Sequence, residues 1–239
     1  MIELIDICYK DIIKEINLKI DFKDRIILAG PNGSGKTLLS LIIAGMIKQT
    51  SGKVLVDGNN IENIDVKDLR KKIGIVFQEP EMQFVTMNVE KEIEFGMQNL
   101  NFPDYEINDM KEHLIEKFSI KEIRKNSPFE ISGGEKQIVA IASIIAMKPQ
   151  FIIFDEVTSF LDIKYRKKIY NFIEGYSGGF LWITQNFDEF PIGKTLITLE
   201  RGRIVFVDDI EKMIKEEKLP TSETLIRKRI REEGLEKYI

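Results

Sequence analysis

An α/β fold built around a mainly parallel sheet is predicted by three features of this 239-residue sequence. A glycine-rich turn joins an apolar run, Arg25–Ala29, to a helical run, Leu38–Ile47. Two further segments, Phe151–Phe154 and Phe180–Thr184, are almost wholly apolar. Unbroken apolar runs of this length are typical of strands buried on both faces, as the strands of a parallel sheet are.

The glycine-rich turn fits G-x-x-x-x-G-K-[ST], the pattern of a phosphate-binding loop. Its glycines let successive N–H groups point at a phosphate, and the start of the following helix adds partial positive charge. Lys36 is expected to reach the β- and γ-phosphates, and the Thr37 hydroxyl to hold Mg²⁺. An ordinary strand–helix turn is the alternative, which the complete pattern disfavours. The expected nucleotide-binding residues of this loop are Asn32, Gly33, Ser34, Gly35, Lys36 and Thr37.

Two acids, Asp155 and Glu156, directly follow the run Phe151–Phe154. A central parallel strand would deliver them to the carboxyl edge of the sheet, where ligands bind in open α/β folds. We expect Asp155 to hold Mg²⁺ through water and Glu156 to polarise an attacking water. Acids at a strand end also serve as helix caps, but the phosphate loop elsewhere in the chain favours the catalytic interpretation.

A second glycine-bearing motif, Ile131–Gln137, opens the helical segment Val139–Met147. Two glycines and a serine at a helix N-terminus leave N–H groups free and expose the positive end of the helix dipole, which predicts an anion site. A second phosphate-binding device in one chain is unexpected unless it serves the nucleotide of another molecule. A glycine-bearing loop that merely caps a helix is the alternative.

Together these motifs resemble the ATP-binding cassette (ABC) ATPases, which have a P-loop NTPase core, and the resemblance covers nearly the whole chain. In that family the S-G-G-x-x-Q signature of one subunit closes over the γ-phosphate held by the opposite subunit. The resemblance implies ATP and Mg²⁺ as cofactors and ATP hydrolysis as the activity. It also implies that the nucleotide of a partner subunit is contacted by Ser132, Gly133, Gly134 and Gln137.

Three other positions match the pattern of the family. Gln78 ends the apolar strand Ile73–Phe77, where the family has a glutamine that contacts Mg²⁺ and relays to a membrane partner. Asp162 ends Ser159–Asp162, which resembles the loop that crosses the dimer interface. Tyr9 lies where an aromatic residue usually stacks on adenine. Stacking requires only a flat ring face, so ordinary packing is the alternative for Tyr9.

One residue of the family pattern is replaced. Where the family has a histidine that contacts the γ-phosphate and the attacking water, this chain has Gln185. A glutamine can donate a hydrogen bond but cannot carry a proton or a positive charge. The only histidine, His113, falls in a charged segment and is expected to be an exposed helix residue. The expected catalytic residues are therefore Glu156, Gln185 and Gln78, in a site expected to turn over slowly.

Composition predicts a folded cytoplasmic protein that works without a membrane span of its own. Hydrophobic residues make up 43% and charged residues 31% of the chain, which is ordinary for a globular domain. No apolar stretch approaches the roughly 20 residues of a membrane helix, and the N-terminus lacks the basic start of a signal peptide. The single cysteine excludes an internal disulfide. A net charge of −4 does not indicate the basic surface that proteins binding nucleic acid usually have.

The chain is expected to divide into a cassette, residues 1–208, and a helical C-terminal extension, residues 209–239. An antiparallel β edge is predicted by alternating apolar residues in Glu3–Tyr9, Ile16–Phe22 and Lys53–Asp57. Helical spacing appears in Val89–Gln98 and Ile107–Phe118, so an inserted helical subdomain is expected at about residues 79–147. Strands are expected to return in Thr195–Leu199 and Arg203–Val207.

Two features resemble the ATPases of energy-coupling factor (ECF) importers of vitamins and metals. Gln83 lies five residues after Gln78, where those ATPases carry a short helix that contacts the transmembrane scaffold subunit. In the tail, one helical face is indicated by the spacing of Leu225, Ile226, Ile230 and Leu235, as in an extension that pairs two ATPase subunits. A polar loop residue and a solvated surface helix are the respective alternatives.

These resemblances imply the ATPase subunit of an ECF-type importer, peripheral on the cytoplasmic face of the cell membrane. The implied partners are a second, related ATPase chain, a transmembrane scaffold contacted near Gln83, and a separate membrane subunit that binds the substrate. An ordinary ABC importer ATPase and a weakly hydrolysing regulatory cassette remain alternatives. A soluble ABC protein acting on nucleic acid or the ribosome is disfavoured, because such proteins usually carry two cassettes or a long coiled-coil insert.

Overall fold

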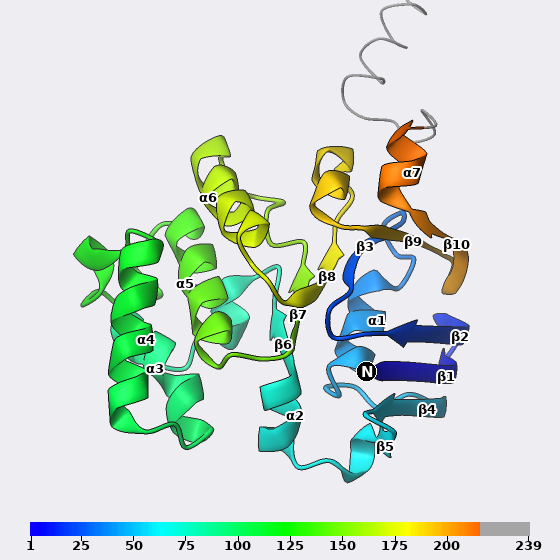
Figure 1. Ribbon diagram of the computed structural model, residues 1–239, viewed down its shortest axis with the longest axis horizontal. Coiled ribbons are helices and arrows are strands. Elements are labelled where there is room, and N and C mark those ends of the chain that lie inside the picture. Colours follow the sequence, from blue (N-terminus) through cyan, green and yellow to red (C-terminus); the bar gives the residue numbers. More distant parts are fainter. Residues whose placement is uncertain (216–239) are drawn as a thin grey trace, which may run out of the picture.

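The computed structural model describes residues 1–215 and has two sheets with helices packed against them (Figure 1). The larger sheet has six strands in the order β10-β9-β3-β8-β7-β6. All neighbouring pairs are parallel except β9 and β10, so the predicted mainly parallel sheet is confirmed. Its strands are β3 (Arg25–Ala29), β6 (Ile73–Val76), β7 (Phe151–Asp155), β8 (Gly179–Ile183), β9 (Thr195–Glu200) and β10 (Arg203–Asp209).

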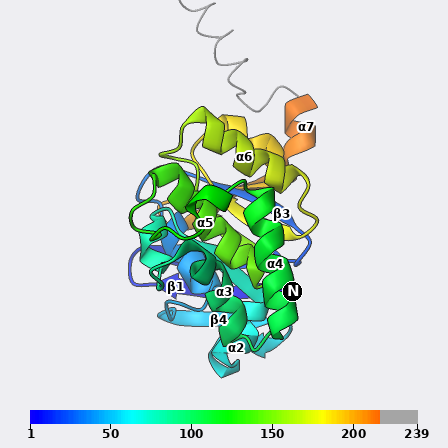
Figure 2. The ribbon, with the colours of Figure 1, turned by 90° about the vertical axis from the view of Figure 1, so that its left-hand side faces the viewer.

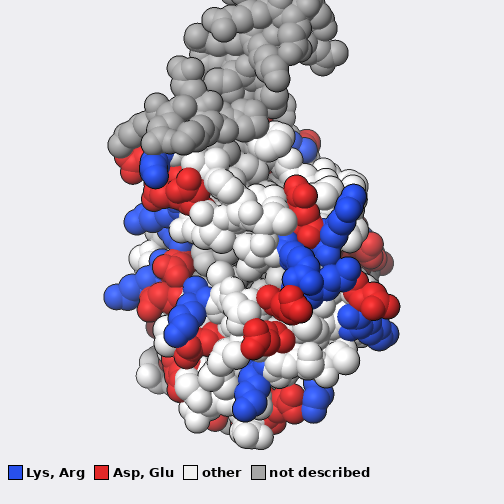
Figure 3. Space-filling view, turned by 90° about the vertical axis from the view of Figure 1, so that its right-hand side faces the viewer, with Lys and Arg blue, Asp and Glu red and all other residues white. Residues whose placement is uncertain are grey.

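The predicted antiparallel edge is confirmed as a separate four-stranded sheet in the order β2-β1-β4-β5. It lies at the opposite side of the molecule from helices α3 to α5 (Figure 1). The strands are β1 (Ile2–Tyr9), β2 (Ile13–Ile20), β4 (Ser51–Val56) and β5 (Asn59–Asn60). On the face in Figure 3, Lys and Arg side chains are interspersed with Asp and Glu side chains.

Burial on both faces explains the apolar runs of the large sheet. In β7, Phe151 and Ile153 pack into the core shared with the antiparallel sheet, whereas Ile152 and Phe154 pack into the core under the helices. Successive strand residues point to opposite faces, so a strand covered on both sides must be apolar at every position. Trp182 of β8, which is fully buried, belongs to the core under the helices.

The helices have somewhat different limits from those predicted. Helix α1 begins at Lys36, inside the phosphate-loop pattern, and ends at Ile43 rather than Ile47. It stops because Gly45 adopts a left-handed conformation with φ of 66°. The other α-helices are α2 (Val66–Lys72), α3 (Val89–Asn99), α4 (Asp104–Lys117), α5 (Gly133–Ala146), α6 (Ile163–Glu174) and α7 (Ile210–Lys215), and the short 3₁₀ helices are η1 (Ile61–Asn63), η2 (Pro80–Gln83), η3 (Lys121–Ile123) and η4 (Phe187–Ile192).

The expected C-terminal extension, residues 209–239, lies largely outside the described residues, which include only its residues 209–215 with helix α7. Within residues 1–215, none of the helices has the length and hydrophobicity needed to cross a lipid bilayer. His113 lies on α4 and is exposed, as predicted.

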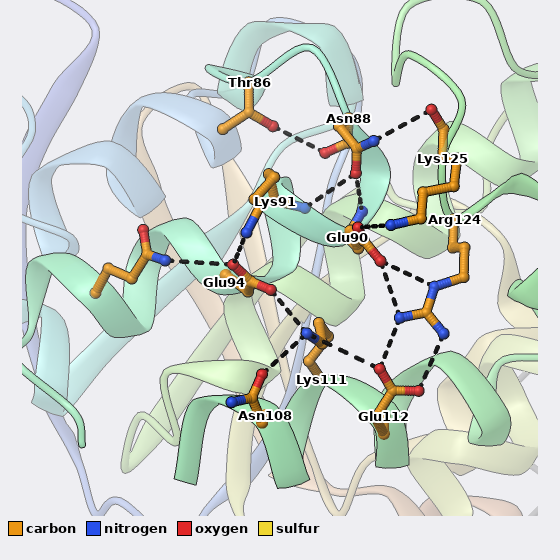
Figure 4. Close-up of polar contacts among 11 residues, drawn as sticks. Thr86, Asn88, Glu90, Lys91, Glu94, Asn108, Lys111, Glu112, Arg124 and Lys125 are labelled. Atoms are coloured by element: carbon orange, nitrogen blue, oxygen red, sulfur yellow. Dashed lines mark hydrogen bonds and ion pairs between the residues drawn. The ribbon is translucent and has the colours of Figure 1, made fainter. Parts of the chain in front are cut away.

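Helices α3, α4 and α5 pack side by side (Figure 2), and buried ion pairs link α3 to its neighbours (Figure 4). Glu90 accepts a hydrogen bond of 2.9 Å from Arg124 Nε and another from Lys125 Nζ, both in the loop that leads to α5. Glu94 accepts 2.8 Å from Lys111 Nζ on α4. Because these carboxylates are buried, their ion pairs fix the loop before α5 and helix α4 against α3.

The same ion pairs set the protonation of the two acids. Burial alone would raise the pKa of Glu94, but the hydrogen bonds from Lys111 and Lys91 lower it below its usual value of 4.5. The pKa of Glu90 is likewise lowered, because the bonds from Lys125 and Arg124 outweigh burial. A lowered folded-state pKa contributes stability that is complete above the unfolded-state pKa and is lost as pH falls through the folded-state value.

The thermal midpoint of unfolding should therefore fall as the pH drops below about 4.5. Glu94→Gln should lower the midpoint at pH 7, because Lys111 loses its charged partner, and should show a smaller further drop in acid. Glu116→Gln, at an exposed glutamate on α4, is the control and should keep the wild-type pH dependence. Melting curves from pH 7 to pH 3.5 test this, and identical acid sensitivity in Glu94→Gln and wild type would contradict it.

Candidate functional site

The phosphate-loop pattern runs from the end of β3 into α1, and two of its glycines are required by the backbone. Gly35 is the N-cap of α1 with φ of 102°, and a Cβ there would lie 2.7 Å from Ile13 Cδ1. A Cβ on Gly30 would lie 2.1 Å from the Leu199 carbonyl oxygen. The loop is therefore pressed against β2 and β9, and no larger residue fits at either glycine.

Polar groups inside the loop lack partners suited to them. Lys36 is 5% exposed, and its Nζ donates to the carbonyl oxygens of Gly30 at 2.9 Å and Pro31 at 3.1 Å. Among residues 1–215, Lys36 forms no ion pair with an acid. Ser34 Oγ is buried and has no hydrogen-bond partner in the described part of the chain. A buried ammonium and an unpartnered hydroxyl in one loop fit an anionic ligand with several oxygens.

Asp155, at the end of β7, lies beside the start of α1. Its Oδ1 accepts a 3.3 Å hydrogen bond from Thr37 Oγ1. Burial raises the pKa of Asp155 to about 6, and the charge of Glu156 adds to the effect. No cluster of three or more His, Cys, Asp or Glu residues able to hold a metal occurs in residues 1–215. The oxygens of Asp155 and Thr37 fit Mg²⁺, which usually binds one or two protein oxygens together with phosphates and water.

Three segments of the chain meet at Glu156. Its Oε1 accepts 2.9 Å from Gln185 Nε2, and its Oε2 accepts 3.2 Å from Ser159 Oγ and 3.5 Å from Gln78 Nε2. The Gln185 amide also donates 2.6 Å to Asn32 Oδ1 in the phosphate loop. A continuous hydrogen-bond chain thus runs from Asn32 through Gln185 to Glu156. The structure brings together the predicted residues of the loop, the acid pair, Gln78 and Gln185.

The second glycine motif begins helix α5 with a capping box. Ser132 Oγ accepts 3.4 Å from the Glu135 N–H, and Glu135 Oε2 accepts 2.9 Å from the Ser132 N–H. A Cβ on Gly133 would meet no atom within 4 Å, whereas one on Gly134 would lie 2.2 Å from the Tyr165 ring. Gly133 therefore faces open space, and Gly134 permits α5 to pack closely against α6.

The remaining predicted residues are spread around this centre. Gln137 is buried, and its Nε2 donates a 3.2 Å hydrogen bond to the Phe77 carbonyl. Together with Gly133 it also lines a cavity of about 290 Å³, whose other lining residues include Gln78 and Glu156. Asp162 is exposed and caps α6.

Tyr9, at the end of β1, is half-buried, and its carbonyl accepts 3.0 Å from the Ile12 N–H. Ile12 and Ile13 border the position of Gly35. The turn that follows Tyr9 therefore lies against the phosphate loop, but the Tyr9 ring itself makes no hydrogen bond to a loop residue.

Sequence reasoning missed two features beside the acid pair. Ser159 supplies a hydrogen bond to Glu156, although its motif was recognised only for Asp162. Phe160 and Ile163 are 82% and 71% exposed on the same loop and the start of α6. The sequence could not identify these exposed side chains, because Val157 and Leu161 of the same segment are equally apolar and are buried.

Comparison with known proteins agrees with this geometry. Residues 13–159 match the family described as ABC transporter. The energy-coupling factor transporter ATP-binding protein EcfA1 of Mycoplasmopsis synoviae is 35% identical over 214 residues, which cover 87% of this chain and 79% of that protein.

Solved structures match over most of the chain as well. The cbiO1 protein of Clostridium perfringens, described as part of the ABC transporter complex cbiONQ, superposes with a TM-score of 0.78 and 25% identity, covering 96% of this chain and 94% of its own. A dimeric ATP-binding cassette, MJ0796, solved in a post-hydrolysis state with ADP and Pi, gives 0.79 and 25%, covering 88% and 99%. The range matched by the family, residues 13–159, contains the phosphate loop, the acid pair and helix α5, and this chain belongs to the ABC transporter family.

Proposed function

We propose that this chain is the ATP-binding and ATP-hydrolysing subunit of an ECF-type importer, which powers uptake of a vitamin or metal through a membrane scaffold. The hydrogen-bond chain from Asn32 through Gln185 to Glu156 carries the proposal, because it holds a candidate base at the mouth of a phosphate loop. The ECF assignment is supported by the similarity to EcfA1 of Mycoplasmopsis synoviae. The chain would lie on the cytoplasmic face of the cell membrane.

In this proposal the phosphates of ATP lie on the backbone of residues 32–37, with the Lys36 ammonium leaving its two carbonyl partners for the β- and γ-phosphates. Thr37, Asp155 and Gln78 would hold Mg²⁺, which neutralises charge that develops during phosphoryl transfer. Glu156 would accept the hydrogen bond of the attacking water, and Gln185 would keep Glu156 oriented. The ring of Tyr9 would stack on the adenine.

A second, related cassette would complete the site. The open space at Gly133 and the exposed side chains of Phe160 and Ile163 support a partner surface there. Ser132, Gly133, Gly134 and Gln137 would close over the ATP of the partner, and Asp162 would cross the interface. The extension of residues 209–239 would pair the subunits, but it lies largely outside the described residues.

The scaffold subunit would dock beside Gln83, in a groove of about 300 Å³ between α2, α3 and α5. Gln83 itself is turned inward, because its Nε2 donates 2.9 Å to the Ala140 carbonyl and 3.2 Å to Ser143 Oγ. Gln83 would therefore shape one wall of the groove rather than reach out of it. Val85, 61% exposed, lines the same groove and would contact the scaffold directly.

A slower, regulatory role for the chain's own site is the second candidate, and Gln185 favours it. An amide at this position can orient Glu156, as the 2.9 Å bond indicates, but it cannot supply a positive charge near the γ-phosphate. The faster site of the pair would then be the one formed by the partner's phosphate loop and this chain's signature.

Lys36→Ala should abolish binding of Mg-ATP, because it removes the one lysine of the phosphate loop. Isothermal titration with a non-hydrolysable ATP analogue measures the effect. Lys19→Ala, at a lysine that is 73% exposed on β2, is the control and should bind as wild type does. Unchanged affinity in Lys36→Ala would refute the nucleotide site.

Val85→Asp should weaken assembly with the scaffold roughly tenfold or more, because it places a charge against an apolar partner surface. Val205→Asp introduces the same charge on β10, where Val205 is 53% exposed, and should leave assembly unchanged. Co-purification from detergent-solubilised membranes compares the two, with nucleotide affinity measured in parallel. If both variants assemble with the scaffold equally well, the groove is not the docking site of the scaffold.

Glu156→Gln and Gly133→Asp distinguish the two sites of the cassette pair. Loss of a general base costs on the order of a hundredfold to ten-thousandfold at one site. If this chain's own site is slow, Glu156→Gln lowers the steady-state ATPase rate of the pair only partly. Gly133→Asp, which fills the open space of the signature, should nearly stop it. Equal losses in the two variants would contradict an asymmetric pair.

A further inference from the structure

Glu189 is a buried acid that the proposed chemistry does not use. It lies in η4, four residues after Gln185, and is only 1% exposed. Burying a carboxylate costs several kcal/mol unless its oxygens are hydrogen-bonded. Within residues 1–215, no lysine or arginine forms an ion pair with Glu189. Its position must therefore be stabilised by neutral donors.

Three donors from three separate segments meet at this carboxylate. Oε1 accepts from Thr158 Oγ1 and, at 2.7 Å, from the Tyr170 hydroxyl on α6. Oε2 accepts 2.8 Å from Trp182 Nε1 on β8. Charged acceptors form stronger hydrogen bonds than neutral ones, so the carboxylate binds all three segments tightly.

Two of these segments carry the candidate catalytic groups. Thr158 lies two residues after Glu156, and its neighbour Ser159 donates to Glu156 Oε2. Trp182 lies three residues before Gln185, whose amide donates to Glu156 Oε1. The two segments are therefore joined twice. Gln185 and Glu156 form a direct hydrogen bond, and Glu189 accepts hydrogen bonds from Thr158 and Trp182 of the same two segments.

We infer that Glu189 is a positioning residue that fixes the segment Glu156–Asp162 relative to the turn that carries Gln185. This inference rests on the proposed ATP hydrolysis. Through its hydrogen bond with Thr158, Glu189 fixes the position of the Glu156 carboxylate. It also fixes the position of the rest of this segment, which would contact the second cassette. None of its three donors belongs to the phosphate loop, which Gln185 contacts only through Asn32, so we expect nucleotide affinity to change little when a donor is removed.

Thr158→Val and Tyr170→Phe form a matched pair, since each removes one hydroxyl from the same oxygen of Glu189. Displacing a catalytic group by about 1 Å costs up to roughly a hundredfold in rate. We therefore expect Thr158→Val to lower kcat of this chain's own site, measured with the other site blocked, by about ten- to hundredfold, with KM for ATP nearly unchanged. Tyr170→Phe should keep kcat within about twofold, because α6 carries no catalytic group.

The turnover of this chain's own site is isolated by adding Gly133→Asp to the same chain. That change blocks the other site, which is formed by the partner's phosphate loop and this chain's signature, and leaves the partner's signature intact. Thr158→Ser, which keeps the hydroxyl, should restore the rate, and Glu189→Gln should reproduce the loss. Folding is followed through Trp182, the only tryptophan of the chain, whose buried indole changes emission on unfolding.

Equal effects of Thr158→Val and Tyr170→Phe on kcat, or no effect of either, would show that Glu189 only stabilises the core and would overturn the inference. An increase in KM with unchanged kcat in Thr158→Val would overturn it as well. Absence of ATPase activity in the wild-type pair would instead refute the proposed function, so the two failures are distinguishable.

Discussion

The candidate site depends on the burial of both faces of the six-stranded sheet. Because β3, β8 and β7 are covered on both sides, the polar residues they deliver emerge only at their carboxyl ends. The order β3-β8-β7 places the turn after β8 between the phosphate loop and the acid pair. Gln185 therefore reaches Asn32 on one side and Glu156 on the other, although the residues are far apart in sequence.

Much of this arrangement was predictable from sequence. The unbroken apolar runs identified the central strands, and the spacing of glycines, Lys36 and Thr37 identified the loop. The position of Gln185 followed from its place after an apolar strand. Boundaries were predicted less well: α1 ends at Ile43 rather than Ile47, because Gly45 adopts the left-handed conformation that commonly follows the end of a helix.

The hydrogen bonds that hold the site were not predictable. Glu90 and Glu94 lie in a charged helix that reads as solvent-exposed, but packing against α4 and the loop before α5 buries both. Gln83 was expected at a partner surface, and its amide instead bonds to α5. Nothing in the sequence around Glu189 indicated that its carboxylate would be buried and hydrogen-bonded. In each case the partner lies on another element, so only the tertiary arrangement decides whether a polar side chain faces water or protein.

Helix α3 contacts both the loop that leads to the signature and the groove proposed for the scaffold. Helix α3 is fixed to the loop that leads to the signature through Glu90, while Glu92 accepts 2.7 Å from the Thr86 N–H beside the groove proposed for the scaffold. Glu90 and Glu92 are buried, although the Lys125 side chain that pairs with Glu90 is 71% exposed.

The central claim is that ATP on this chain's phosphate loop lies opposite the signature of a second cassette. The most direct measurement is the structure of the complex purified from its native membrane, trapped with Mg-ATP by Glu156→Gln. The account predicts the γ-phosphate beside Lys36, with the signature of the partner closing over it and Ser132 of this chain over the partner's nucleotide. Nucleotide bound away from residues 30–37, or a signature that faces solvent in the ATP-bound pair, would contradict it.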